Sequence, residues 1–111
     1  MAAARPLNHP EMVRYAGAVV EALGARGCPP DERWDEARGV ALYWTTVTEC
    51  RPRGLLVFWH VTDGWQTVPL NDDGVPVMAE SQPLSIDTVA APDAVAEALL
   101  PLVRGDAPPA A

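Results

Sequence analysis

Few residues of this sequence could do chemistry, and His60 is the first to consider. It follows Phe58 in a run of β-branched and aromatic residues, and Trp65 comes after the next turn. A catalytic histidine needs a nucleophile or an orienting carboxylate within hydrogen-bond reach. Residues that the fold would have to bring close are Cys50, Asp63, Ser81 and Ser85. We therefore expect His60 to be a histidine on the surface of a strand, and we predict no catalytic residues.

Two acidic stretches could attract a hard cation. The second is Asn-Asp-Asp-Gly at 71–74, and the first has four carboxylates, at Asp31, Glu32, Asp35 and Glu36. Calcium takes about six to eight oxygen ligands. The first stretch lacks the EF-hand spacing and contains Arg33, with Arg38 close behind, while the second is too short. We predict solvated turns and no metal site.

The remaining candidates are two arginines and two cysteines. Arg51 and Arg53 could hold a phosphate, but the net charge of −7 provides no basic patch, so a solvated turn is expected. Cys28 and Cys50 form no metal motif, and we expect reduced thiols rather than a disulfide. No Gly-rich phosphate loop, CxxC, HExxH or GxSxG motif occurs. The sequence thus indicates no cofactor and favours a protein that is not an enzyme.

Composition narrows the class of protein. With 111 residues, 49% hydrophobic and 21% charged, the chain is typical of one globular domain. The acidic charge disfavours nucleic acid and membrane surfaces as partners. No apolar stretch is long enough to span a membrane and no signal peptide is recognisable, so we expect a cytoplasmic protein. Eight arginines without a lysine, together with much Ala, Gly and Pro, indicate a GC-rich genome such as that of an actinobacterium.

A β-hairpin from 54 to 70 is the strongest structural signal. Asp63-Gly64 between two β-favouring runs predicts a two-residue type I′ turn. That turn pairs Thr62 with Trp65 and places two sets of side chains on opposite faces. The predicted core face carries Val57, Trp59, Val61, Gln66, Val68 and Leu70. The other face carries Leu56, Phe58, His60, Thr62, Trp65, Thr67 and Pro69.

The rest of the chain predicts a two-layer α+β domain. An amphipathic helix is expected near 10–25, with His9 as its cap and Gly24 or Gly27 at its end. A second helix begins at Pro92, and Pro101 should kink or end it. Between the helices we expect an antiparallel meander of 3–5 strands: a short piece near Trp34, then 40–49, 54–62, 65–70 and 84–89. The predicted organisation is a flexible arm over 1–9, one domain over 10–104 and a flexible tail over 105–111.

Three segments also resemble a family of actinobacterial domains of unknown function that is common in streptomycetes. They are Val-Phe-Trp-His-Val-Thr-Asp-Gly-Trp at 57–65, Tyr-Ala-Gly-Ala-Val-Val-Glu-Ala-Leu at 15–23 and Ala-Pro-Asp-Ala-Val-Ala at 91–96. The chain departs from the family after Leu70, where Asn-Asp-Asp-Gly replaces a Gly-rich stretch. The resemblance implies the fold and the source, and it carries over no site residues.

Two functions from different classes follow from these observations. We predict a small acidic interaction or regulatory module that binds a protein partner, or a second copy of itself, through an aromatic sheet face. The expected binding residues are Tyr43, Phe58, His60 and Trp65. The alternative is a small-ligand-binding protein or minimal enzyme with a pocket between sheet and helices. The exposure of the aromatic face depends on two segments, because either segment 71–83 or the N-terminal arm could fold over that face, and otherwise it stays open to solvent.

Overall fold

The structure is a computed structural model that describes residues 8–45 and 54–104. Its elements, in chain order, are α1 (His9–Ala25), β1 (Glu32–Glu36), β2 (Gly39–Trp44), β3 (Leu55–His60), β4 (Gly64–Pro69), the 3₁₀ helix η1 (Met78–Glu80), β5 (Gln82–Pro83) and α2 (Pro92–Arg104). The five strands form one antiparallel sheet in the order β1-β2-β3-β4-β5. The predicted α+β class, with a meander between two helices, is confirmed.

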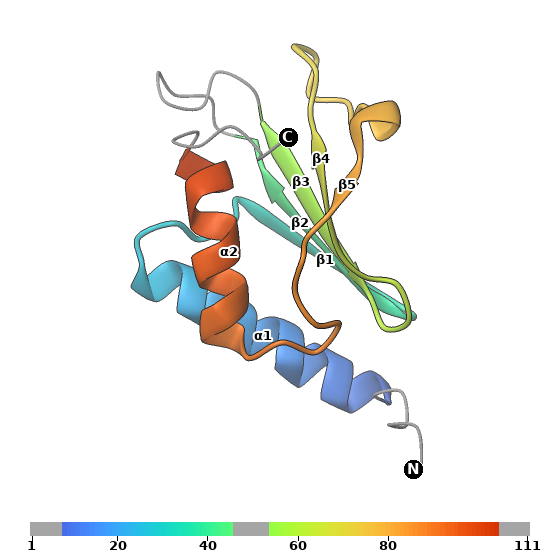
Figure 1. The fold of residues 1–111 in the computed structure, drawn as a ribbon, viewed down its shortest axis with the longest axis vertical. Coiled ribbons are helices and arrows are strands. Elements are labelled where there is room, and N and C mark those ends of the chain that lie inside the picture. Colours follow the sequence, from blue (N-terminus) through green and yellow to red (C-terminus); the bar gives the residue numbers. More distant parts are fainter. Residues whose placement is uncertain (1–7, 46–53, 105–111) are drawn as a thin grey trace.

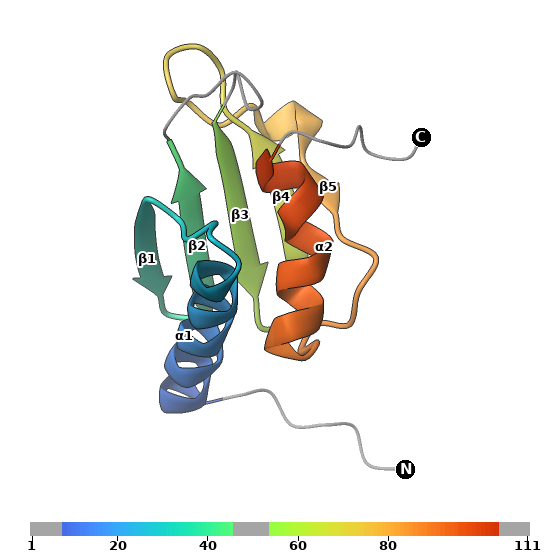
Figure 2. The same ribbon diagram turned by 90° about the vertical axis from the view of Figure 1, so that its left-hand side faces the viewer.

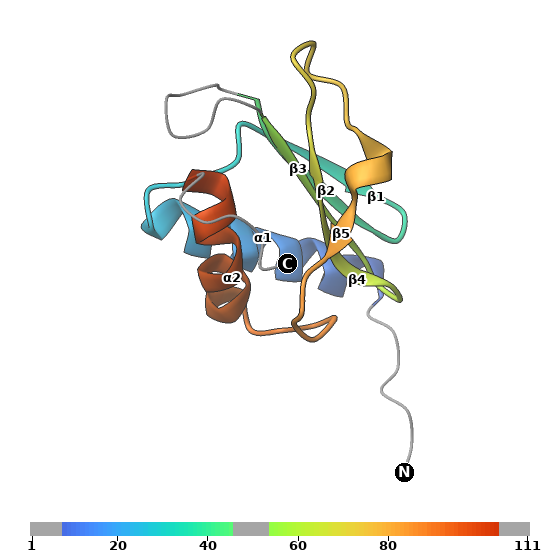
Figure 3. The same ribbon diagram turned by 45° about the horizontal axis from the view of Figure 1, so that its top comes forward.

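Both helices pack on the same face of the sheet (Figure 1 and, with the helices toward the viewer, Figure 2). We call this the inner face and the opposite one the outer face. The core between the layers is apolar and includes Val19, Leu23, Leu42, Trp44, Val57, Trp59, Trp65, Val95 and Leu99. Figure 3 shows η1 on the other side of the sheet from the helices. The structure therefore has a covered face and a second face that, among the described residues, η1 and its flanking loop approach.

Helix α1 begins one residue earlier than the sequence predicted. Asn8 is its cap: the Asn8 side chain accepts from the backbone N–H of Glu11, and the Glu11 carboxylate accepts from the N–H of Asn8, both at 2.9 Å. The prediction of His9 as the cap is wrong, because this reciprocal capping box needs the Asn at position 8. At the other end Gly27, with φ of 76°, lets the chain leave the helix as predicted.

The hairpin register differs from the prediction. His60 pairs with Gly64 and Trp59 with Trp65, so the loop has three residues, Val61 to Asp63, instead of two. A type I′ turn needs positive φ at both central positions, but only Gly64 has it here, with φ of 82°. The observed pairing is offset from the predicted one by an odd number of residues. Since side chains alternate along a strand, this offset moves Trp65 to the face of Val57 and Trp59.

Near the C-terminal end, the prediction of a strand over 84–89 is wrong, and of the two expected effects of Pro101 the end of the helix does not occur. Residues 84–89 form no strand; β5 is limited to Gln82–Pro83, and the chain then bends toward α2. Pro101 does not end α2, which continues to Arg104. Some parts of the predictions lie outside the described residues: the arm over 1–7, the end of the second strand at 46–49, Cys50, Arg51, Arg53 and the tail over 105–111.

An aromatic cluster of Tyr15, Trp59 and Trp65 joins the two layers. The ring centroids lie 5.1 Å (Tyr15 to Trp59) and 6.1 Å (each ring to Trp65) apart. The Tyr15 hydroxyl donates to the Ala90 carbonyl at 2.6 Å and accepts from the Trp65 indole N–H at 3.3 Å. The Trp59 indole N–H donates to the Thr88 carbonyl at 2.6 Å. These bonds fix the irregular segment before α2 against both α1 and the sheet.

Tyr15→Phe tests this cluster. Burial raises the pKa of Tyr15, although the hydrogen bond from Trp65 lowers it. A raised pKa in the folded state means that the stability from this group is present below about pH 10 and is lost as pH rises through the folded value. We expect Tyr15→Phe to lower the free energy of unfolding at pH 7 by about 1–3 kcal/mol, since two partners lose their bond. Its alkaline decline in stability should be shallower than that of wild type.

Urea unfolding between pH 7 and pH 11 measures both effects. Tyr43→Phe is the matched control, because the Tyr43 hydroxyl makes no hydrogen bond to the described residues, and it should cost less than about 0.5 kcal/mol at pH 7. Equal losses in the two variants would contradict the role given to Tyr15.

Candidate functional site

The outer face of the sheet carries a row of side chains that the strand register defines. Trp34 of β1 lies opposite Ala41 of β2, and Ala41 lies opposite Phe58 of β3. Directly opposed residues in antiparallel strands share a face, with Cβ atoms about 4.5–5.5 Å apart. Trp34 is 59% exposed, whereas Ala41 is buried and Phe58 partly buried. The row therefore has a large aromatic side chain at each end and the small side chain of Ala41 between them, which forms its floor.

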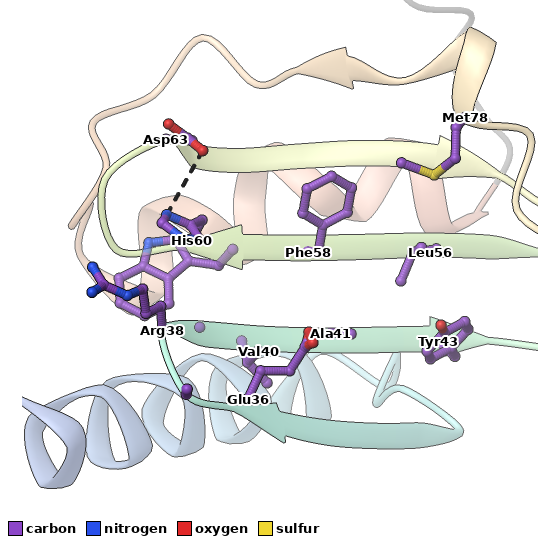
Figure 4. A pocket seen from close by; sticks show the side chains of 13 residues that line it. Glu36, Arg38, Val40, Ala41, Tyr43, Leu56, Phe58, His60, Asp63 and Met78 are labelled. Atoms are coloured by element: carbon purple, nitrogen blue, oxygen red, sulfur yellow. Dashed lines mark ion pairs between the residues drawn. The ribbon is translucent and has the colours of Figure 1, made fainter.

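A hollow of about 510 Å³ opens over this floor. Figure 4 shows its lining side chains on the face away from the helices, with Tyr43 and Leu56 toward one end and His60 and Arg38 at the other. Met78 from η1 overhangs the Leu56 end and is 58% exposed. The predicted pocket position was between sheet and helices, where the indoles of Trp44, Trp59 and Trp65 lie buried. The hollow thus lies on the opposite side of the sheet.

A hydrogen bond between two turns helps to build the polar end of the hollow. The N–H of Val61 donates to the Arg38 carbonyl at 2.9 Å, which joins the β3–β4 loop to the β1–β2 turn. Gly39 makes this close approach possible, because a Cβ there would lie 1.8 Å from the Trp59 carbonyl oxygen. The two turns bring His60 and Arg38 to the same end of the hollow. The described residues offer the Arg38 guanidinium no ion pair or side-chain hydrogen bond.

The surroundings of His60 do not form a catalytic relay. Its Nδ1 lies 3.1 Å from the backbone N of Thr62, 2.8 Å from the Thr62 hydroxyl and 3.7 Å from Asp63 Oδ2. A backbone N–H can only donate, so Nδ1 is the acceptor of the bond from Thr62. A triad needs the nucleophile and the carboxylate on different ring nitrogens. Here both approach Nδ1, so the group stabilises the hairpin loop.

The structure brings together three of the four predicted binding residues. Tyr43, Phe58 and His60 line the hollow, each partly exposed. Trp65 does not join them: it is on the inner face, 1% exposed, because of the three-residue hairpin loop. The sequence analysis missed Trp34 and Met78 as exposed members of the outer face. The alternation of charged residues around Trp34 was the signal for the first, since it is typical of an exposed edge strand.

Segment 71–83 covers only part of the outer face. Val68 and Leu70 are buried there, in a small apolar cluster with Ala41 and Leu56. The N–H of Val77 donates to the Pro69 carbonyl at 2.9 Å, which holds the segment over the end of β4. The turn at 71–74 forms as predicted, and Asn71 Oδ1 accepts from the backbone N–H groups of Asp73 and Val75. Tyr43 and Phe58 pack against this cluster and stay partly exposed.

The first acidic stretch is divided by the alternation of β1. Glu32 and Glu36 share the outer face with Trp34, while Asp35 pairs with Arg33 on the inner side at 2.8 Å. Asp31 accepts from the backbone N–H of Thr45 at 2.7 Å. Within residues 8–45 and 54–104, no three His, Cys, Asp or Glu side chains gather as metal ligands would. Cys28 is a free, partly buried thiol.

Comparison with known protein families, curated proteins and solved structures found no match. The resemblance to an actinobacterial domain family therefore stays a prediction. A search of the described helices for one both long and apolar enough to cross a bilayer found none. The geometry of the outer face is thus the basis for a functional argument.

The same substitution at two tryptophans tests which face each one occupies. We expect Trp65→Thr to lower the free energy of unfolding by about 3–5 kcal/mol, because it leaves a cavity in the core. Trp34→Thr should change it by less than about 1 kcal/mol, since threonine suits an exposed edge strand. Urea titration followed by far-UV circular dichroism gives both values. A destabilised Trp34→Thr with an unaffected Trp65→Thr would reverse the assignment of the two faces.

Proposed function

We propose that this protein is a small acidic interaction module that binds a protein partner through its outer sheet face. One observation carries the proposal: the helices cover one face of the sheet, while on the other Trp34 and Met78 are exposed and Phe58 is partly exposed. Exposed apolar patches on single domains mark interaction surfaces more often than isolated exposed residues do. Trp and Met are also enriched in protein interfaces.

The contrast between the tryptophans supports this choice of face. Trp44, Trp59 and Trp65 are buried, and each indole N–H has a hydrogen-bond acceptor. Trp34 is the exception in both respects among the described residues, since it is largely exposed and its N–H has no such acceptor. Burial of a large aromatic side chain by a partner contributes more to the free energy of binding than burial of most other side chains. Trp34 is therefore the anchor that we assign to the partner.

A cytoplasmic location is part of the proposal. The free thiol of Cys28 fits it, because structural disulfides are rare in that compartment. The acidic net charge of −7 favours basic over acidic partners and disfavours self-association of the outer face through charge repulsion. A partner protein is accordingly proposed in preference to a homodimer.

Affinity capture from a lysate of the organism that encodes the protein tests the proposal. Wild type should retain at least one protein that Trp34→Thr and Met78→Ser lose, as read by mass spectrometry. Val89→Ser is the matched control, because Val89 is 50% exposed but belongs to the loop that connects β5 to α2. The proposal fails if all four baits retain the same proteins. Circular dichroism establishes that each bait is folded.

A second function, binding of a small ligand, is favoured by the hollow itself. Its volume of about 510 Å³ lies within the range of about 300–1,000 Å³ for ligand pockets. A ligand at 100 times its dissociation constant should stabilise the fold by about 2.7 kcal/mol, which a thermal-shift screen of metabolites detects. Ala41→Val places a larger side chain on the floor and should abolish the shift. Silence across the screen for wild type would count against this alternative.

A further inference from the structure

We propose that the partner presents an arginine or lysine side chain, which the outer face takes above Ala41, between Trp34 and Phe58 and beside the Glu36 carboxylate. This inference rests on the proposed function and names the chemistry of the partner. Three features of the outer face support it: the shape of the row Trp34, Ala41 and Phe58, the carboxylates of β1, and the absence of an ion pair that engages these carboxylates within the described residues.

The row places one small residue between two aromatic ones. Ala41 faces Trp34 on one side and Phe58 on the other, and Tyr43 follows Ala41 by two residues along β2 on the same face. Because Ala41 ends at its Cβ, the aromatic side chains rise around a low floor. The ring faces of Trp, Phe and Tyr carry negative charge density, which attracts an ammonium or guanidinium group. The site thus favours a cation attached to an apolar stem.

The carboxylates of β1 lie where they would meet that cation. Glu36 reaches across β2 toward Ala41, and it lines the hollow (Figure 4). Glu32 shares its face and lies opposite Tyr43. Neither carboxylate has an ion-pair partner among the described residues, whereas Asp35 on the inner side is paired with Arg33. The outer face of β1 is therefore a strip of uncompensated negative charge next to an exposed indole.

The other charges of the hollow do not favour an anion. Arg38 lies at the His60 end, where Asp63 Oδ2 is 3.7 Å from His60 Nδ1. Glu36 and Asp63 outweigh Arg38, and the net charge of −7 attracts cations from a distance. A metal ion is a poor fit, because it would need several oxygen ligands where Glu36 supplies one carboxylate. A cationic side chain of a protein needs only one carboxylate and a ring.

A pair of synthetic peptides tests the inference directly. One is a short fluorescein-labelled peptide that alternates threonine and arginine; the other has citrulline, a neutral isostere, in place of each arginine. Fluorescence polarisation should show that wild type binds the arginine peptide about fivefold or more tightly than the citrulline peptide. Glu36→Gln should weaken binding of the arginine peptide about two- to fivefold. Trp34→Thr should weaken it at least as much.

Glu21→Gln is the matched control, since it removes one charge from the exposed side of α1, away from the sheet. Equal binding of the two peptides, or equal weakening by Glu36→Gln and Glu21→Gln, would overturn the inference. A further outcome is that wild type binds both peptides alike and Trp34→Thr binds neither. The face would then dock peptides without a cation. The inference then fails while the proposed function stands. Lysate capture that is indifferent to Trp34→Thr would instead remove the proposed function.

Discussion

The hydrogen bond from the Tyr15 hydroxyl to the Ala90 carbonyl is the contact on which the arrangement of layers depends. Tyr15 is on α1, Ala90 precedes α2, and the same hydroxyl accepts from Trp65 on β4. One side chain thus joins both helices and the sheet. The bond from Trp59 to Thr88 repeats the link from β3. Buried polar groups of aromatic residues usually find such partners, because leaving them unpaired costs about 1–3 kcal/mol.

The length of one hairpin loop decides which aromatic residues are inside and which are outside. With three residues between His60 and Gly64, Trp65 faces the helices and joins Tyr15; with two, it would have faced solvent. The sequence signal Asp-Gly is compatible with both loops, because each uses a glycine at positive φ. Local turn chemistry left the choice open, and burial of a second tryptophan beside Trp59 settles it. Such a tertiary contact cannot be found by a local pattern.

Elements with local signals were predicted and those held by tertiary contacts were not. The amphipathic stripe and glycine end of α1, the order of the meander and the turn at 71–74 are all encoded within a few residues. Residues 84–89 alternate as a strand would, yet their carbonyl at Thr88 is taken by an indole N–H and that at Asp87 by the N–H of Ala90. Their backbone bonds go to side chains and a turn, which no alternation pattern reveals.

The candidate site was predicted only in part, because some of its residues are placed by tertiary contacts and not by a local pattern. Tyr43, Phe58 and His60 share a face by alternation alone, whereas Met78 reaches it through the loop that covers Val68 and Leu70. Trp34 combines an exposed ring with an edge strand, a position that would invite pairing with other sheets. The charges of Glu32 and Glu36 oppose that pairing, since an incoming neutral strand would have to desolvate them. A basic side chain of the proposed partner would compensate the same charges, so the residues that protect the edge would also select the side chain that binds beside it.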